Sequence, residues 1–176
     1  MSEDTVKIGI VTAEESGDLL AAEFIKALSL SNKKVQIHGL VGEKLRYMIN
    51  EAPTEVDRTV FNVMGLIDPF LNLQKILGER KKLLNYFLKQ NIDIFIGVDS
   101  PDLNLYFHKN LKNKQDVMNI QLVSPSVWGW RPKRINLLKK YVDLTLCLFK
   151  FEHQFLQQNA VNSLHLGHPF SEKGCP

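Results

Sequence analysis

The chain has 176 residues, 44% of them hydrophobic and 23% charged, which fits one soluble globular domain with its own core. The net charge of +3 is mild, so composition alone does not indicate a nucleic-acid-binding protein, which would need a dense basic face. The longest apolar runs are strand-sized and far below the roughly 20 residues that cross a bilayer, so we expect no transmembrane helix.

The amino terminus and the two cysteines indicate the compartment. Residues 1–7 are polar and acidic, without the basic stretch and apolar run of a secretory signal, so we expect a cytoplasmic location. Cys147 and Cys175 have neither metal-ligand spacing nor the density of a disulfide scaffold, so we interpret both as reduced.

Short β-branched segments alternate with longer amphipathic segments along the chain. In chain order we expect a strand at 6–11, a helix at 18–30, a strand at 35–41, a helix at 70–90, a strand at 92–98, a helix at 103–111, a strand at 119–123, a helix at 132–141, a strand at 144–148, a helix at 151–158 and a short strand near 163–166. The segment 92–98 is apolar on both faces, which is typical of a central parallel strand. This order predicts an α/β fold with an open, mostly parallel sheet of six or seven strands and helices on both faces.

Ligands of such sheets lie beyond the carboxyl ends of the strands, which directs attention to four loops. The first contains Glu14, Ser16 and Asp18 and leads into a helix, so its backbone N–H groups suit an anion. Neither a dinucleotide-binding fingerprint nor a phosphate-binding P-loop is present. The alternative interpretation is that Ser16 or Asp18 only caps the helix.

The second loop follows the central strand and contains Asp99, Asp102 and Asn104. A carboxylate there suits a general base that deprotonates a sugar hydroxyl, and Asp99 is the better candidate because it directly follows the strand. The alternative is that both aspartates are helix caps or turn formers.

The third and fourth loops combine polar groups with aromatic rings. Two tryptophans and an arginine in one loop suit sugar stacking and phosphate binding, although a lid packed over the core would have the same composition; the candidates are Ser124, Ser126, Trp128, Trp130 and Arg131. In the fourth loop, His168 is either a ligand contact or a turn residue. No His/Cys/Asp cluster has metal-ligand spacing, so we expect no metal.

An apolar segment from residue 63 to residue 77 is followed by Arg80, Lys81 and Lys82. Ordinary helix packing explains this pattern, but so does shallow insertion into a membrane with anionic headgroups. The basic residues between 133 and 140 are likewise either a solvated helix face or a contact for an anionic partner.

Five motifs together resemble the lipid A disaccharide synthase family: A-E-E-S-G-D at 13–18, V-M-G-L at 63–66, D-S-P-D-L-N at 99–104, S-P-S-V-W-G-W-R at 124–131 and G-H-P at 167–169. The resemblance implies a glycosyltransferase of lipid A and lipopolysaccharide biosynthesis. In that reaction 2,3-diacylglucosamine passes from its UDP derivative to 2,3-diacylglucosamine 1-phosphate, with inversion at the anomeric carbon and release of UDP. The implied fold is the B-type architecture of two Rossmann-like domains, with no cofactor beyond the UDP-sugar donor.

Residue by residue, Asp99 matches the family's essential aspartate, and Glu14, Ser16 and Asp18 match its first loop. The family's membrane-contacting apolar patch falls on Ile67, Pro69, Phe70, Leu73, Ile76 and Leu77. The resemblance therefore implies peripheral attachment to the inner face of the bacterial inner membrane. Ala13 departs from the family's usual glycine.

The resemblance also implies a missing half. Family members are roughly twice as long, and residues 1–176 match their amino-terminal, acceptor-side domain, so we expect the UDP-sugar-binding domain to be absent and the chain alone to lack appreciable turnover. The candidate partners are an acylated glucosamine phosphate lipid, an anionic membrane surface, a separate carboxyl-terminal half or a second copy of the chain, and no nucleic acid. The competing functions are a non-catalytic, membrane-associated lipid-binding module and a sugar-nucleotide epimerase, of which the latter leaves the tryptophan-rich loop unexplained.

Overall fold

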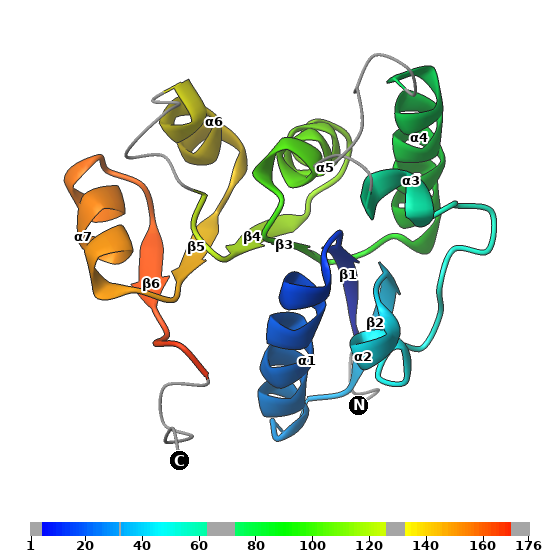
Figure 1. Ribbon diagram of the computed structural model, residues 1–176, viewed down its shortest axis with the longest axis horizontal. Coiled ribbons are helices and arrows are strands. Elements are labelled where there is room, and N and C mark those ends of the chain that lie inside the picture. The colour runs from blue at the N-terminus through cyan, green and yellow to red at the C-terminus, as the bar shows by residue number, and fades with distance from the viewer. Residues whose placement is uncertain (1–4, 32, 63–72, 126–132, 170–176) are drawn as a thin grey trace.

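The sheet is six-stranded and entirely parallel. The computed structural model describes residues 5–31, 33–62, 73–125 and 133–169 (Figure 1). The strand order is β2-β1-β3-β4-β5-β6, and the strands are β1 (Val6–Thr12), β2 (Val35–Leu40), β3 (Ile94–Val98), β4 (Met118–Leu122), β5 (Leu144–Cys147) and β6 (Ser163–His165). The predicted α/β fold with an open parallel sheet is therefore confirmed.

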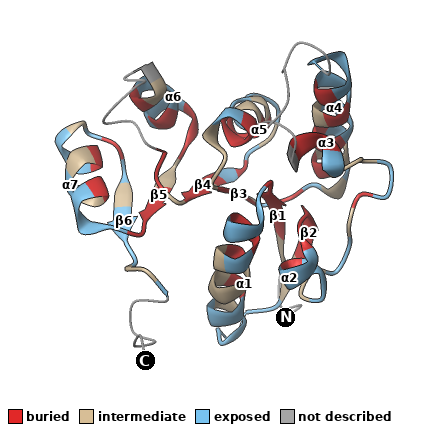
Figure 2. Ribbon diagram, in the orientation of Figure 1, coloured by how far each residue is buried: buried red, intermediate tan, exposed pale blue. Residues whose placement is uncertain are grey.

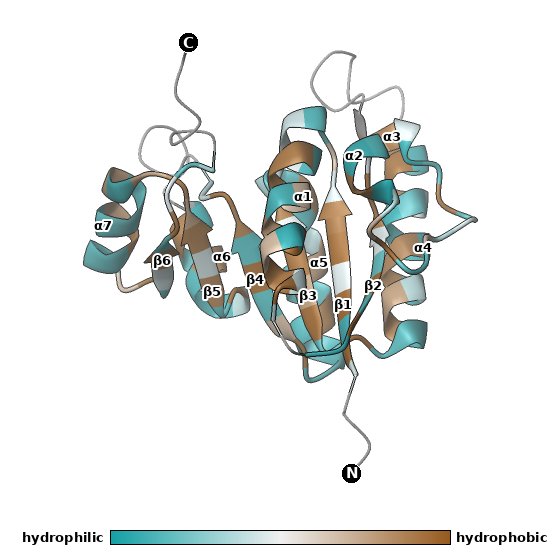
Figure 3. Cartoon of the chain, turned by 90° about the horizontal axis from the view of Figure 1, so that it is seen from below, coloured by the Kyte–Doolittle hydropathy of each residue, from teal (hydrophilic) through white to brown (hydrophobic). Residues whose placement is uncertain are grey.

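Helices cover both faces of this sheet. They are α1 (Glu15–Ser29), α2 (Glu43–Arg46), α3 (Thr59–Asn62), α4 (Leu73–Gln90), α5 (Pro101–Lys114), α6 (Lys133–Tyr141) and α7 (Lys150–Gln158). In Figure 1, α1 and α2 lie on one side of the sheet and α4, α5 and α6 on the other. Figure 3 shows α1 lying over the apolar strands, where it contacts β1 and β3. The short helices α2 and α3 were not predicted, because four residues are too few to show a helical period.

Two hydrophobic layers hold the helices to the sheet, because successive strand residues point to opposite faces. One layer, between the sheet and helices α4 and α5, contains Phe87, Phe95 and Phe107, none of which has any exposed surface. The ring centroid of Phe87 lies 5.6 Å from that of Phe95 and 6.2 Å from that of Phe107. The other layer packs Ala21 and Ile25 of α1 on Ile8, Ile10 and Ile96. In Figure 2, buried residues run through the strands and along parts of α1, α4 and α5.

In the described ranges, no helix is both long and apolar enough to cross a membrane. Cys147 is a buried free thiol, and burial raises its pKa to about 12. Cys175 lies outside the described residues.

Replacement of the central ring of the aromatic layer should destabilise the fold strongly. We expect Phe87→Ala to lower the free energy of unfolding by about 3–5 kcal/mol, because it removes a fully buried ring and leaves a cavity against Phe95 and Phe107. Urea unfolding followed by circular dichroism measures this change. Leu30→Ala is the control, since Leu30 is 84% exposed and should cost less than about 0.5 kcal/mol. Similar losses for both variants would contradict the assigned core.

Candidate active site

The candidate site lies where the strand order reverses. From β1 the chain continues to β2 on one side, whereas β3 flanks β1 on the other, so the loops after β1 and β3 diverge at the carboxyl edge of the sheet. Open parallel sheets bind their ligands at such a switch point. The two loops nevertheless touch at their bases: a Cβ atom built on Gly17 would lie 3.5 Å from Cγ1 of Val98 and 3.7 Å from Cβ of Asp99. The first turn of α1 therefore lies against the start of the Asp99 loop.

The backbone at this edge is strained. Asp99, Ser100 and Val123 have φ angles of 49°, 33° and 73°, which place three non-glycine residues in the left-handed region. Such a residue is uncommon, and a β-branched one such as Val123 is a clear outlier. Asn91 and Ala160 also have positive φ, but they lie one residue beyond α4 and two residues beyond α7, where a left-handed residue commonly ends a helix. Strain at sheet edges of this kind accumulates at functional sites.

Asp99 directly follows β3 at the carboxyl edge of the sheet, and its role as a base stays a prediction. Its N–H donates to the carbonyl oxygen of Leu122 at 2.9 Å, and its own carbonyl oxygen accepts from Asn104 and Gln121. Within the described residues these hydrogen bonds use the backbone of Asp99, and its half-buried carboxylate stays available for a ligand.

A buried polar network lies directly beneath Asp99. Asn104 Nδ2 donates to the carbonyl oxygens of Val98 at 3.0 Å and Asp99 at 2.8 Å. Gln121 Nε2 donates to the carbonyl oxygens of Asp99 at 3.0 Å and Val123 at 3.2 Å. The Gln121 Oε1 atom lies 3.1 Å from Nε2 of His108, which therefore carries the proton. Asn104, His108 and Gln121 are all fully buried, and the Asn104 side chain binds backbone carbonyl groups, so its expected contact with substrate stays a prediction.

Sequence reasoning gave no role to His108 or Gln121. The usable signals were the i, i+4 spacing of Asn104 and His108, which places both on one face of α5, and the alternation of Asn119 and Gln121 in a strand otherwise lined by apolar residues. Burial lowers the pKa of His108 to about 4, although its hydrogen bond with Gln121 acts in the opposite direction, so the ring is neutral near pH 7.

Asp18 joins the elements around the loop after β1, on the side of the site opposite to the Asp99 loop. Its buried carboxylate accepts hydrogen bonds from Thr12 Oγ1 at 3.0 Å and from the N–H groups of Gly42 at 2.6 Å and Lys44 at 2.9 Å. It thus ties the end of β1 to the first turn of α1 and the start of α2. These contacts give Asp18 a structural role inside the fold, and its expected contact with substrate stays a prediction.

The remaining predicted ligand contacts are spread over the carboxyl edge. Glu14 and Ser16 are exposed at the start of α1. Asp102 is exposed and accepts a hydrogen bond from Arg134 Nη2 at 2.5 Å, whereas the Ser124 hydroxyl is buried and donates to the carbonyl oxygen of Pro125 at 3.2 Å. His168 lies near Phe149, with ring centroids 5.9 Å apart, beside α7 and not beside Asp99. Ser126, Trp128, Trp130 and Arg131 lie outside the described residues.

Of the six predicted membrane contacts, two are exposed, one is buried and three lie outside the described residues. Leu73 and Leu77, one helical turn apart on α4, are 48% and 49% exposed. Ile76 is only 7% exposed and belongs to the hydrophobic core, so it does not share their surface. Ile67, Pro69 and Phe70 lie outside the described residues.

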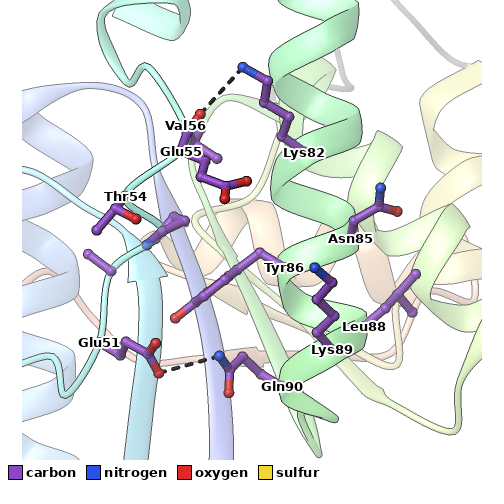
Figure 4. A pocket seen from close by; sticks show the side chains of 12 residues that line it. Glu51, Thr54, Glu55, Val56, Lys82, Asn85, Tyr86, Leu88, Lys89 and Gln90 are labelled. Carbon is purple, nitrogen blue, oxygen red and sulfur yellow. Dashed lines mark hydrogen bonds between the residues drawn. The ribbon is translucent and has the colours of Figure 1, made fainter.

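A groove of about 710 Å³ runs along α4 beside the outer strand β2. Residues 51–56 form one wall, and Lys82, Asn85, Tyr86 and Lys89 form the other (Figure 4). The hydroxyl of Tyr86 lies 3.2 Å from Nδ1 of His38, a buried residue of β2 behind this lining. None of the lining residues belongs to the four loops predicted from the sequence. Among the described residues, no group of three or more His, Cys, Asp or Glu side chains is arranged to hold a metal ion.

Comparisons with known proteins agree on one family. The lipid-A-disaccharide synthetase family matches residues 8–175 of the chain. The chain is 34% identical to the lipid-A-disaccharide synthase of Acinetobacter baylyi over 98% of its length, and 38% identical to lipid-A-disaccharide synthase 2 of Legionella pneumophila strain Paris, also over 98%. It spans 43% and 44% of the length of these two curated relatives.

The fold also matches a solved structure. A glycosyltransferase from Rickettsia africae ESF-5 superimposes with a TM-score of 0.53 at 16% identity, over 94% of this chain and 43% of that protein. At this identity the match supports the Rossmann-like fold alone.

The neutral state of His108 should make the fold sensitive to mild acid. An unfolded histidine titrates near 6.5, so between that value and about 4 the unfolded chain binds a proton that folded His108 excludes. The stabilisation is complete above roughly pH 6.5 and is lost as the pH falls towards 4. From pH 7 to pH 5 this residue should lower the free energy of unfolding by about 2 kcal/mol.

Urea unfolding of the wild type and of His108→Phe at both pH values measures this contribution. The phenylalanine keeps a ring against Phe95, which packs on His108 at a centroid distance of 5.0 Å. The variant should lose about 2 kcal/mol less than the wild type between pH 7 and pH 5. Equal losses would show that His108 is not held neutral.

Proposed function

Because the chain belongs to the lipid-A-disaccharide synthetase family, we propose that it forms the acceptor side of a lipid A disaccharide synthase. In the proposed reaction, 2,3-diacylglucosamine is transferred from its UDP derivative to 2,3-diacylglucosamine 1-phosphate. The products are lipid A disaccharide 1-phosphate and UDP. Since the chain spans less than half of its curated relatives, we assign binding of the UDP-sugar to the part that it does not span.

The position of Asp99 is the single observation that carries this proposal. A sugar hydroxyl is a poor nucleophile at neutral pH, and a carboxylate within hydrogen-bond reach removes its proton as it attacks the anomeric carbon. Asp99 lies at the switch point of the sheet, with a carboxylate that the described residues leave available. The first turn of α1 lies beside it, and its N–H groups suit a phosphate group of a substrate.

In this mechanism the transfer is a single displacement with inversion. The acceptor hydroxyl oxygen forms a bond to the anomeric carbon as the bond from that carbon to the UDP oxygen breaks, and the hydroxyl proton passes to Asp99. The UDP leaves with the bonding electron pair. We propose that neither a metal ion nor a further cofactor takes part.

The surface of α4 supports a second element of the function, namely attachment to an anionic membrane. Leu73 and Leu77 expose about half of their side chains on one helix face, and exposed Lys81 follows one turn after Leu77. Exposed apolar side chains beside a lysine suit the boundary between acyl chains and anionic headgroups. We propose that this face rests on the inner surface of the bacterial inner membrane, where the acylated substrates reside. The same observation favours the alternative function, a lipid-binding module without catalysis.

Disaccharide formation tests the catalytic proposal. The chain is mixed with a separately expressed carboxyl-terminal part of the Acinetobacter baylyi relative, and product is measured from both acylated substrates. We expect activity only in the complemented sample. Asp99→Asn should lower kcat about 10²–10⁴-fold, because it removes the base while asparagine tolerates the left-handed backbone.

Asp116→Asn is the matched control, since this exposed aspartate precedes β4 at the opposite edge of the sheet and should keep full activity. A folded, associated complex that makes no disaccharide would favour the non-catalytic module. Full activity of Asp99→Asn would show that Asp99 is not the general base.

Membrane attachment is tested by sedimentation with vesicles of phosphatidylethanolamine and phosphatidylglycerol. The variant Leu73→Glu/Leu77→Glu should bind about tenfold more weakly or worse, because apolar burial is lost and negative charge is added. The control Leu30→Glu/Leu164→Glu adds the same charge at leucines that are exposed elsewhere, on α1 and β6. If the two double variants bind equally well, α4 is not the membrane face.

A further inference from the structure

The left-handed residues at the sheet edge require an external restraint. Each costs on the order of 1–3 kcal/mol and persists only where the surroundings fix it. Asp99 and Val123 terminate neighbouring strands, β3 and β4, and each is strained at the first residue of its loop. Backbone hydrogen bonds hold their N–H groups, from Asp99 to the carbonyl oxygen of Leu122 and from Val123 to that of Leu146, so the restraint of their carbonyl groups has to come from elsewhere.

Gln121 provides that restraint. Its side-chain amide donates to the carbonyl oxygens of Asp99, Leu122 and Val123, at 3.0, 3.3 and 3.2 Å. It is the side chain that joins the carbonyl groups of both strained residues, because Asn104 reaches only Val98 and Asp99 within the described residues. One fully buried amide group thus couples the exit of β3 to the exit of β4.

His108 determines which end of the Gln121 amide faces these carbonyl groups. The two ends of a glutamine amide have almost the same shape, but only the NH₂ end attracts a carbonyl oxygen. The oxygen end of Gln121 faces Nε2 of His108 on α5, and the NH₂ end faces Asp99 and Val123. The Nε2–H tautomer of His108 favours this orientation, because a flipped amide would place its NH₂ group against that N–H. The close approach depends on Gly97, since a Cβ atom there would lie 2.7 Å from Cβ of Asn104 and 3.0 Å from Nε2 of His108.

We propose that Gln121, oriented by His108, is a positioning residue that aims the Asp99 carboxylate at the acceptor hydroxyl. This inference rests on the proposed function, because it assigns a catalytic consequence to the direction of Asp99. Gln121 and His108 touch no substrate: both are fully buried below the edge. Displacement of a catalytic group by about 1 Å can cost on the order of 10²-fold in rate, so loss of the amide acts on catalysis through Asp99.

The first test is Gln121→Met in the complemented synthase assay. Methionine has a similar length but supplies neither the donors nor the acceptor. We expect kcat per folded molecule to fall about 10–100-fold with a change of less than threefold in KM. In an Asp99→Asn background the same substitution should cause no further loss, because the group that Gln121 positions is already absent.

His108→Phe should lower kcat in the same way. The double variant His108→Phe/Gln121→Met should have a kcat no lower than that of the poorer single variant.

Thr145→Val is the matched control. Thr145 is fully buried, is paired in register with Gln121 on the neighbouring strand β5, and its hydroxyl has no hydrogen-bond partner among the described residues. It should keep the wild-type kcat. If Gln121→Met changes the melting temperature but not kcat, or lowers kcat equally in the wild-type and Asp99→Asn backgrounds, the network serves stability alone and the positioning role is overturned.

An NMR measurement separates this inference from the proposed function. The imidazole ¹⁵N shifts should identify the Nε2–H tautomer of His108, and Gln121→Met should shift the amide resonances of Asp99, Ser100 and Val123 while Thr145→Val leaves them in place. An inactive wild-type complex, or an active Asp99→Asn variant, would reject the proposed function. An unshifted Asp99 resonance in Gln121→Met would reject the positioning role whatever the activity.

Discussion

The carbonyl oxygen of Asp99 accepts hydrogen bonds from Asn104 and Gln121, and the geometry of the carboxyl edge depends on this pair. Each donor comes from a different element, Asn104 from α5 and Gln121 from β4, so the oxygen is fixed between helix and sheet. A left-handed aspartate directs its carboxylate differently from a residue that continues the strand. The strained conformation and the direction of the carboxylate therefore have the same origin in the buried amide groups.

The loop after β1 is fixed by a different interaction, the buried carboxylate of Asp18. It satisfies backbone N–H groups at the start of α2, which would otherwise lack partners, and it holds Thr12 at the end of β1. Gly42 completes this arrangement, because a Cβ atom there would lie 2.5 Å from the Asp18 carboxylate. The first turn of α1 is thereby held against Val98 and Asp99. Buried hydrogen bonds therefore hold both sides of the switch point.

Sequence patterns predicted the sheet well, since a run such as Ile94–Val98 is apolar on both faces only in a central strand. They also placed Asp99 at the ligand edge, because it directly follows that strand. They did not predict the left-handed backbone at Asp99 and Val123 or the pairing of His108 with Gln121, which depend on contacts between α5 and β4. Asp18 matched a helix-cap pattern, but it binds the N–H groups of α2, a helix distant in sequence. No motif or loop singled out in the sequence predicted the groove along α4.

In the proposed reaction, the acceptor binds at the carboxyl edge of β1, β3 and β4. Titration of the ¹⁵N-labelled chain with 2,3-diacylglucosamine 1-phosphate in detergent micelles tests it most directly, with empty micelles as the reference. We expect the amide resonances of Gly17, Asp99, Ser100 and Val123 to shift with the ligand, while those of Ala52 and Asn85 in the groove along α4 stay in place. Shifts confined to the groove, with Asp99 and its neighbours unmoved, would contradict it.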